Sequence, residues 1–130
     1  MTRFALACAS ALLLALPAFG QEPEEAPAEP RSAPLHMISE LAETLGRAHA
    51  VRTLCQGDQD AYWRNYMLTM MSYEGPAGPR RAALTGAFNR GYQSQRRETP
   101  SCSDSSNSLE ARIAARGKEL ADAIARSYMD

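Results

Sequence analysis

The sequence predicts an all-α domain, a small bundle of about four helices with one disulfide. Apolar residues recur with a period near 3.6 in four segments, and no segment alternates with the period of two expected of a half-buried strand. Two well-separated cysteines, Cys55 and Cys102, can form the disulfide. The domain is expected to span residues 35–130, after a signal peptide and a Pro/Glu-rich disordered linker.

The N-terminus has the layout of a secretory signal peptide. MTRFALACASALLLALPAFGQ carries one charge at Arg3, an apolar run over residues 4–16, the breaker Pro17, and the small residues Ala18 and Gly20. This layout predicts cleavage near Gly20 and a periplasmic location. The apolar run is too short to cross a bilayer, so no transmembrane segment is expected in the mature chain.

Residues 21–34, QEPEEAPAEPRSAP, contain four Pro and four Glu and little that can be buried. They are predicted to form a disordered, extended linker. From Leu35 onward the chain has 12 basic and 11 acidic residues. This balance argues against a nucleic-acid partner and against binding to a membrane surface through a polybasic patch.

Cleavage near Gly20 would remove Cys8 and leave Cys55 and Cys102 in an oxidising compartment. Two cysteines allow a single connectivity, so a Cys55–Cys102 disulfide is predicted. In the chain-entropy model, closing a loop of this size contributes about 4 kcal/mol, a large share of a small domain's stability.

The first helix is predicted over residues 34–55, where apolar residues follow the helical period, and Gly57 is expected to end it. Asp58 is the expected N-cap of a second helix over residues 59–73. The apolar and aromatic residues of this second helix cover two adjoining faces, one with Trp63, Met67 and Met70 and the other with Tyr62, Tyr66 and Tyr73.

Pro79 suits the first position of a third helix, in which Gly86 and Gly91 indicate either close packing or a weak helix. A loop over residues 98–108 surrounds Cys102. The last helix is predicted over residues 108–127, and the spacing of Asn107 and Glu110 is that of a capping box.

None of the candidate reactive groups forms a convincing catalytic or metal site. His49 is out of phase with Cys55 on the helix, and Cys55 has a disulfide partner, which disfavours a Cys/His nucleophile. Residues 58–60 resemble the start of a calcium loop but lack its later Gly and Glu. His36, Glu40 and Glu43 share a helix face, for which a solvated edge is the favoured interpretation. We therefore expect no catalytic residue, metal or cofactor.

The second helix carries the densest aromatic and thioether cluster of the chain. Such a stripe usually belongs to the core, but two apolar faces exceed what a small bundle can bury, so an exposed share is expected to contact a partner or ligand. A cluster of arginines follows, interpreted as a solvated face or, alternatively, as a surface for an anionic polymer. It consists of Arg64, Arg80, Arg81, Arg90, Arg96 and Arg97. The predicted partner surface comprises Tyr62, Trp63, Tyr66, Met67, Arg80 and Arg81.

The ordered motifs LAETLGRAHAVRTLC, DAYWRNYM, YEGP, RRAALTGAFNRGY and PSC resemble a small family of exported bacterial proteins known only as a domain of unknown function. The resemblance covers residues 39–128 and is to the form found in alphaproteobacteria. It implies a disulfide and an exported location. It implies no substrate and no functional site.

These observations favour a non-enzymatic periplasmic domain that binds an envelope protein or a wall polymer through the second and third helices. Two alternatives remain open. One is a wall-directed hydrolase with Glu74 or Asp60 as general acid, because carboxylates in apolar surroundings can have raised pKa values. The other is a small-ligand carrier that uses the core of the bundle.

Overall fold

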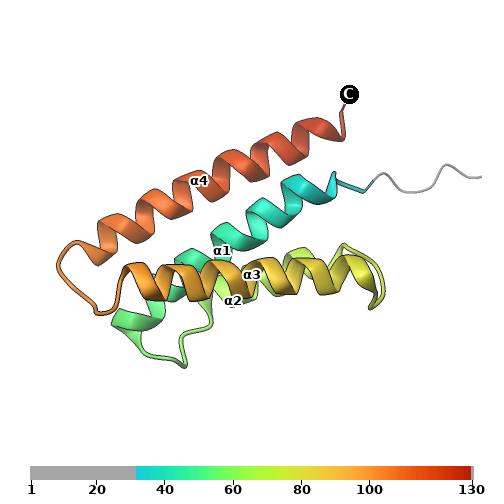
Figure 1. Cartoon of the computed structure of the whole chain (residues 1–130). Coiled ribbons are helices and arrows are strands. Elements are labelled where there is room, and N and C mark those ends of the chain that lie inside the picture. Colours follow the sequence, from blue (N-terminus) through green and yellow to red (C-terminus); the bar gives the residue numbers. More distant parts are fainter. Residues whose placement is uncertain (1–31, 130) are drawn as a thin grey trace, which may run out of the picture.

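The computed structural model describes residues 32–129, so the predicted signal peptide and most of the predicted linker lie outside the described residues. Within this range the chain forms four helices and no strand: α1 (Leu35–Gln56), α2 (Tyr62–Ser72), α3 (Pro79–Glu98) and α4 (Ser106–Ser127) (Figure 1). The predicted all-α fold is confirmed. None of these four helices is both long enough and apolar enough to cross a membrane.

Helix α1 is the centre of the fold. Helices α2, α3 and α4 all pack on α1, whereas α4 makes no close backbone approach to α2 or α3. Ile38, Ala42 and Leu45 of α1 are buried in one cluster with residues of α2 and α3. Because α1 is covered from several sides, its buried residues run from Ile38 to Thr53 and lie on most of its circumference.

Two glycines bring the backbones of α1 and α3 into contact. A Cβ atom at Gly91 would lie 2.0 Å from the carbonyl oxygen of Glu43, and one at Gly46 would lie 2.0 Å from that of Phe88. Neither position therefore has room for a side chain. At Gly86 the nearest atom is the flexible Arg90 side chain, 3.5 Å away, so close packing explains Gly91 but not Gly86.

The predicted helix ends are partly correct. Gly57 ends α1 with a φ of 97°, and its N–H donates to the carbonyl of Thr53. Asp58 is not the N-cap of α2, which begins at Tyr62. Instead, Asp60 accepts hydrogen bonds from the Tyr62 N–H (3.0 Å) and from Arg52 Nε (2.9 Å). A side chain from the preceding helix, Arg52 of α1, thus fixes the carboxylate that precedes α2.

Helix α4 begins two residues before its predicted start, and this removes the expected capping box. Asn107 lies inside the helix, and no side chain caps the first turn. The Ser106 hydroxyl instead accepts a hydrogen bond from the Ser103 N–H (2.9 Å), which orders the turn before the helix.

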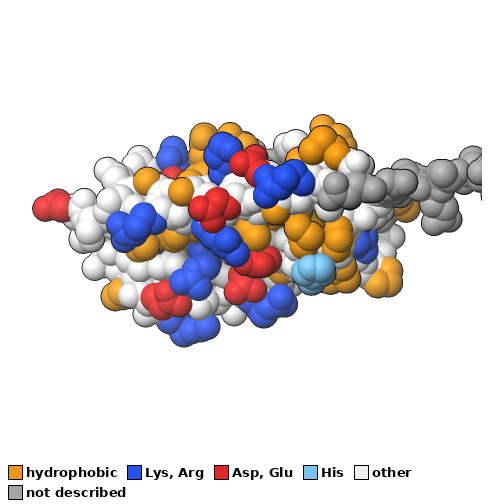
Figure 2. Space-filling model, turned by 90° about the horizontal axis from the view of Figure 1, so that it is seen from above, with side chains coloured by type: hydrophobic (Ala, Val, Ile, Leu, Met, Phe, Trp, Pro, Cys, Tyr) orange, Lys and Arg blue, Asp and Glu red, His pale blue; other side chains and the backbone are white. Residues whose placement is uncertain are grey.

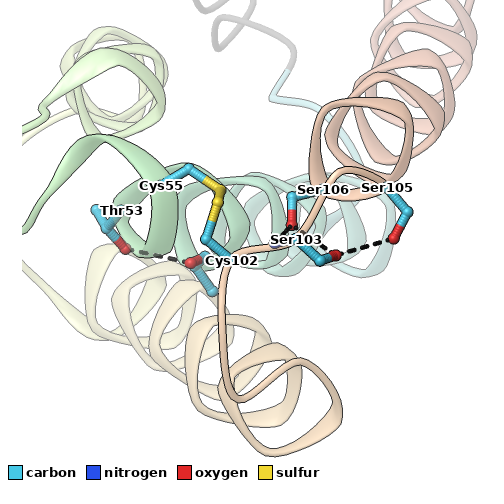
Figure 3. The surroundings of a disulfide bond; sticks show 7 residues. Thr53, Cys55, Cys102, Ser103, Ser105 and Ser106 are labelled. Carbon is cyan, nitrogen blue, oxygen red and sulfur yellow. Dashed lines mark hydrogen bonds between the residues drawn. A yellow bond between two sulfur atoms is a disulfide. The ribbon is translucent and has the colours of Figure 1, made fainter.

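The Cys55–Cys102 disulfide joins the last turn of α1 to the loop that leads into α4. The two Cα atoms are 5.1 Å apart and 47 residues apart in sequence. Figure 3 shows the bond beside Ser103, Ser105 and Ser106 at the start of α4. The bond therefore attaches α4, which otherwise packs closely only on α1, to the end of that helix.

The packed chain begins before α1. Ala33 is buried, its N–H donates to the Tyr128 hydroxyl (2.8 Å), and its carbonyl accepts from Arg80 Nη2 (2.6 Å). These two bonds connect the start of the described chain to the last turn of α4 and the first turn of α3. Ala33 is thus part of the core, although it lies within the predicted linker.

His49 lies in the α1–α3 interface and is nearly buried. Its ring is 5.7 Å from that of Phe88 and 5.6 Å from that of Tyr92, measured between centroids, and its Nδ1 has no hydrogen-bond partner among the described residues. Burial lowers the pKa of His49, with a smaller lowering by Arg64 that Asp60 partly opposes. The folded protein therefore favours the neutral imidazole.

We expect Gly91→Ala to destabilise the domain by about 3 kcal/mol or more, because the added methyl group would overlap the Glu43 carbonyl. Gly86→Ala is the matched control on the same helix. It should stabilise the domain by about 0.5–1 kcal/mol, since its methyl group has room and alanine favours helix. Urea unfolding followed by circular dichroism measures both, and equal effects would contradict the close approach.

We also expect His49 to make folding stability depend on pH. Because the folded pKa is below the unfolded value of about 6.5, the unfolded chain binds the proton more tightly. This contribution is complete above about pH 6.5 and is lost as the pH falls towards the folded pKa.

Replacing His49 by Leu should remove this component, whereas replacing the exposed His36 by Gln should retain it. The measurement is the free energy of unfolding between about pH 7.5 and 5. The same loss on acidification in the His49→Leu variant would contradict the assignment.

Candidate functional site: an apolar groove between α2 and α4

A groove of about 490 Å³ lies between α2 and α4, with α1 as its floor. It exists because α2 and α4 both pack on α1 without a close backbone approach to each other. The floor consists of Leu41, Thr44, Leu45 and Ala48. The walls consist of Trp63, Tyr66, Thr69, Met70 and Tyr73 from α2 and its C-cap, and of Ile113, Ala114, Gly117, Lys118 and Ala121 from α4.

The groove continues towards the last turn of α4. A second hollow, lined by Ile38, Ile124 and Tyr128 among others, shares Leu41, Met70, Tyr73 and Ala121 with the first. The two hollows therefore form one elongated groove along α1. We call the end near Trp63 the disulfide end and the end near Tyr128 the N-terminal end.

The two walls differ in side-chain size. Helix α4 presents Ala114, Gly117 and Ala121 to the groove, whereas α2 presents the large rings of Trp63 and Tyr66. Small residues opposite large ones leave an open space. A Cβ atom at Gly117 would lie in ordinary contact with Thr44 Cγ2, 3.6 Å away, so Gly117 brings α4 close to the floor without a clash.

A hydrogen-bonded cluster joins the walls at the disulfide end. Trp63 Nε1 of α2 donates to Glu110 Oε1 of α4 (2.7 Å), and Arg52 Nη1 of α1 lies 3.4 Å from the same oxygen. The Arg52 guanidinium also stacks 4.6 Å from the centre of the Tyr62 ring. The indole of Trp63 is therefore held in place as one wall of the groove.

The same cluster keeps Asp60 ionised. The hydrogen bond from Arg52, and next that from the Tyr62 N–H, lower the pKa of the Asp60 carboxyl. A general acid must hold a proton at the working pH, so this environment disfavours the acid role considered for Asp60. Glu74, the other candidate acid, has only 5 % of its side chain exposed and forms an ion pair with Arg80 Nε.

The buried polar side chains Thr44 and Glu74 beside the groove have partners. The Thr44 hydroxyl donates to the Glu40 carbonyl (2.8 Å), and Glu74 is paired with Arg80. Lys118 stands at the rim, 77 % exposed, with its Nζ 2.6 Å from Asp122 Oδ2. The described lining thus offers mainly apolar contact, with the exposed residues Thr69 and Tyr73 adding hydroxyl groups on the α2 wall. Such a lining suits an apolar group of a ligand.

The structure gathers only part of the predicted partner surface at the groove. Trp63 and Tyr66 line it, and Tyr62 lies beside them with centroid distances of 5.0 and 5.4 Å. Met67 is 5 % exposed and belongs to the core, so it cannot contact a partner. Met67 lies on the face of α2 that packs against α1 and α3.

The two predicted arginines have intramolecular partners. Arg80 binds Glu74 and the Ala33 carbonyl at the N-terminal end of the groove, and Arg81 Nη1 donates to the Gly75 carbonyl (3.0 Å). Figure 2 shows basic and acidic side chains interspersed on one face of the domain rather than a field of one sign.

The sequence interpretation missed the wall formed by α4. Ala114, Gly117 and Ala121 are spaced three and four residues apart, which places them on one face of the helix. A glycine within a helix of otherwise good helix formers was the available signal. Small residues are usually buried under larger ones, so this signal alone predicts packing and not a groove.

Two residues of the predicted solvated edge on α1, Glu40 and Glu43, lie near arginines of other helices. Glu40 pairs with Arg116 (2.7 Å), and Glu43 lies 3.9 Å from Arg90. Within residues 32–129, no three His, Cys, Asp or Glu side chains are grouped so that they could hold a metal ion.

No curated protein and no solved structure matches the chain. A family model described as "Protein of unknown function (DUF2385)" matches residues 36–128, which include all four helices except Leu35. The match covers the groove, the disulfide and the Trp63–Glu110 bond. The chain therefore belongs to this family of proteins of unknown function.

Proposed function

We propose that this protein is a non-enzymatic binding domain of the bacterial cell envelope, and that the groove between α2 and α4 receives an apolar part of its partner. One observation carries the proposal. The groove combines an aromatic wall, a floor on the central helix and two buried polar side chains, Thr44 and Glu74, that are already paired. Such a surface gains free energy by burying apolar groups and gains little from polar ones.

The aromatic wall has the composition of a binding surface. Tyr66 and Tyr73 are 52 % and 83 % exposed, and Trp63 is fixed by its bond to Glu110. Tyr, Trp and Met are enriched in protein interfaces, and their rings give a large contact area with little loss of side-chain entropy. A preformed wall reduces the cost of binding further.

The envelope location rests on three features. They are the N-terminal sequence with the layout of a signal peptide, the Cys55–Cys102 disulfide, and the resemblance to exported proteins of alphaproteobacteria. Disulfides persist in the periplasm and are rare in the bacterial cytoplasm. We infer that the mature protein acts in the periplasm of such a bacterium.

A small-ligand carrier is the second candidate, because the groove volume of about 490 Å³ falls within the range of small-molecule sites. In this candidate the ligand occupies the same groove, which lies between α2 and α4 rather than inside the bundle core. An enzyme is disfavoured, since Asp60 is held ionised and Glu74 is paired with Arg80.

We expect Ala121→Phe to block the groove, since the added ring would extend from the α4 wall into the space opposite Tyr73. Trp63 is the only tryptophan of the chain, so its fluorescence reports on the groove directly. In a titration with the apolar dye ANS, the variant should bind at least about tenfold more weakly than the natural protein.

Ala115→Phe is the matched control, because Ala115 is exposed on α4 and does not line the groove. It should leave dye binding unchanged. Equal binding by the natural protein and both variants would show that the dye does not use the groove and would remove this support.

The partner itself can be captured by a photo-crosslinking amino acid placed at Tyr66, in cells that produce the protein naturally. We expect a recurrent adduct from Tyr66 that is lost when Ala121→Phe is added. The same crosslinker at Ala111, an exposed position of α4 outside the groove, should not form it. An adduct that forms equally from both positions would contradict a groove-specific partner.

A further inference from the structure

The N-terminal end of the groove lies where the described chain begins. The Ala33 N–H donates to the hydroxyl of Tyr128, and Tyr128 lines that end of the groove. Arg80 holds the Ala33 carbonyl from the other side. The preceding segment, residues 21–31, is therefore attached covalently at the mouth of the groove.

The composition of this segment matches the aromatic wall. Its sequence, QEPEEAPAEPR, contains Pro23, Pro27 and Pro30. Proline-rich segments favour the polyproline II helix, which has low conformational entropy, and grooves lined by aromatic side chains bind such segments. The α2 wall supplies Trp63, Tyr66 and Tyr73.

The distance between Pro27 and Pro30 in a polyproline II helix also matches the distance between Tyr66 and Tyr73 along α2. A polyproline II helix has three residues per turn and rises about 3.1 Å per residue, so Pro27 and Pro30 lie on one edge about 9 Å apart. Tyr66 and Tyr73 are both in the groove wall, and seven residues of α-helix span about 10 Å.

The point of attachment sets the register. Pro30 precedes Ala33 by three residues, a reach of about 9 Å in polyproline II. Tyr73 lines the same hollow as Tyr128, the partner of Ala33, and so is the aromatic residue of the α2 wall at this end of the groove. With Pro30 beside Tyr73, Pro27 lies about 9 Å further along the polyproline II helix and therefore beside Tyr66.

We infer that residues 21–31 bind in the groove as an intramolecular ligand, with Pro30 against Tyr73 and Pro27 against Tyr66. The tether gives the segment an effective concentration in the millimolar range, so even a weak proline–aromatic interaction suffices to occupy the site. An external partner must then displace the segment. This inference rests on the proposed function, because it assigns an internal competitor to the same groove.

The test compares the mature protein with a Pro27→Ser/Pro30→Ser variant, without any added ligand. The reporter is acrylamide quenching of Trp63, whose ring lies 5.5 Å from that of Tyr66. Losing the bound segment should raise the quenching constant by about twofold, since an occupied groove is largely covered. Equal quenching of the two proteins would overturn the inference.

Pro23→Ser is the matched control within the same segment. Pro23 lies about 12 Å beyond Pro27 in polyproline II, which is farther than the distance from Tyr66 to Trp63 along α2. Quenching should therefore stay at the natural level. A rise as large as that of the double variant would overturn the register and the inference with it.

An ANS titration of the double variant separates this inference from the proposed function. We expect the dye to bind several-fold more tightly than to the natural protein, because its competitor is gone. If both proteins bind ANS equally and Ala121→Phe still blocks binding, the segment does not occupy the groove, and the proposed function stands. If the dye binds neither protein, both proposals fail.

Discussion

The structure depends on the contact between the backbones of α1 and α3 at Gly46 and Gly91. Because the two backbones touch, α3 lies directly against one side of α1. The His49 ring of α1 contacts the rings of Phe88 and Tyr92 in this interface. The other sides of α1 remain for α2 and α4, which pack on it separately. The groove follows from this arrangement, because the backbones of two helices that both pack on α1 need not approach each other closely.

The walls of the groove are joined directly at one end and indirectly at the other. The Trp63–Glu110 bond joins α2 to α4 near the disulfide. At the N-terminal end, Ala33 links Tyr128, the C-cap of α4, to Arg80, which pairs with Glu74 after α2. Between these ends, the small residues of α4 lie across from the aromatic rings of α2 and leave the space between the two walls open. Closing the groove would require the walls to lose contacts with α1, so an unoccupied groove does not simply collapse.

The four helices and the disulfide could be predicted because they depend on local pattern and on counting. Pro79, Gly57 and the helical period act within a few residues, and two cysteines have one pairing. The start of α2 at Tyr62, three residues after the predicted one, could not be predicted, since Asp60 is held by Arg52. The burial of Met67 beside the half-buried Trp63 and the partners of Arg80 depend on which helices meet. The groove itself could not be predicted, because it depends on the absence of a close backbone approach between α2 and α4.

The disulfide ties stability to location. A reducing cytoplasm keeps Cys55 and Cys102 as thiols, so the chain would lack the roughly 4 kcal/mol attributed to the closed loop. For a small domain this is a large part of the total free energy of folding. On the proposed route to the periplasm, the folded state of a newly made chain would therefore be less stable before translocation than after it. Oxidation after transport would then add the stabilisation by the closed loop.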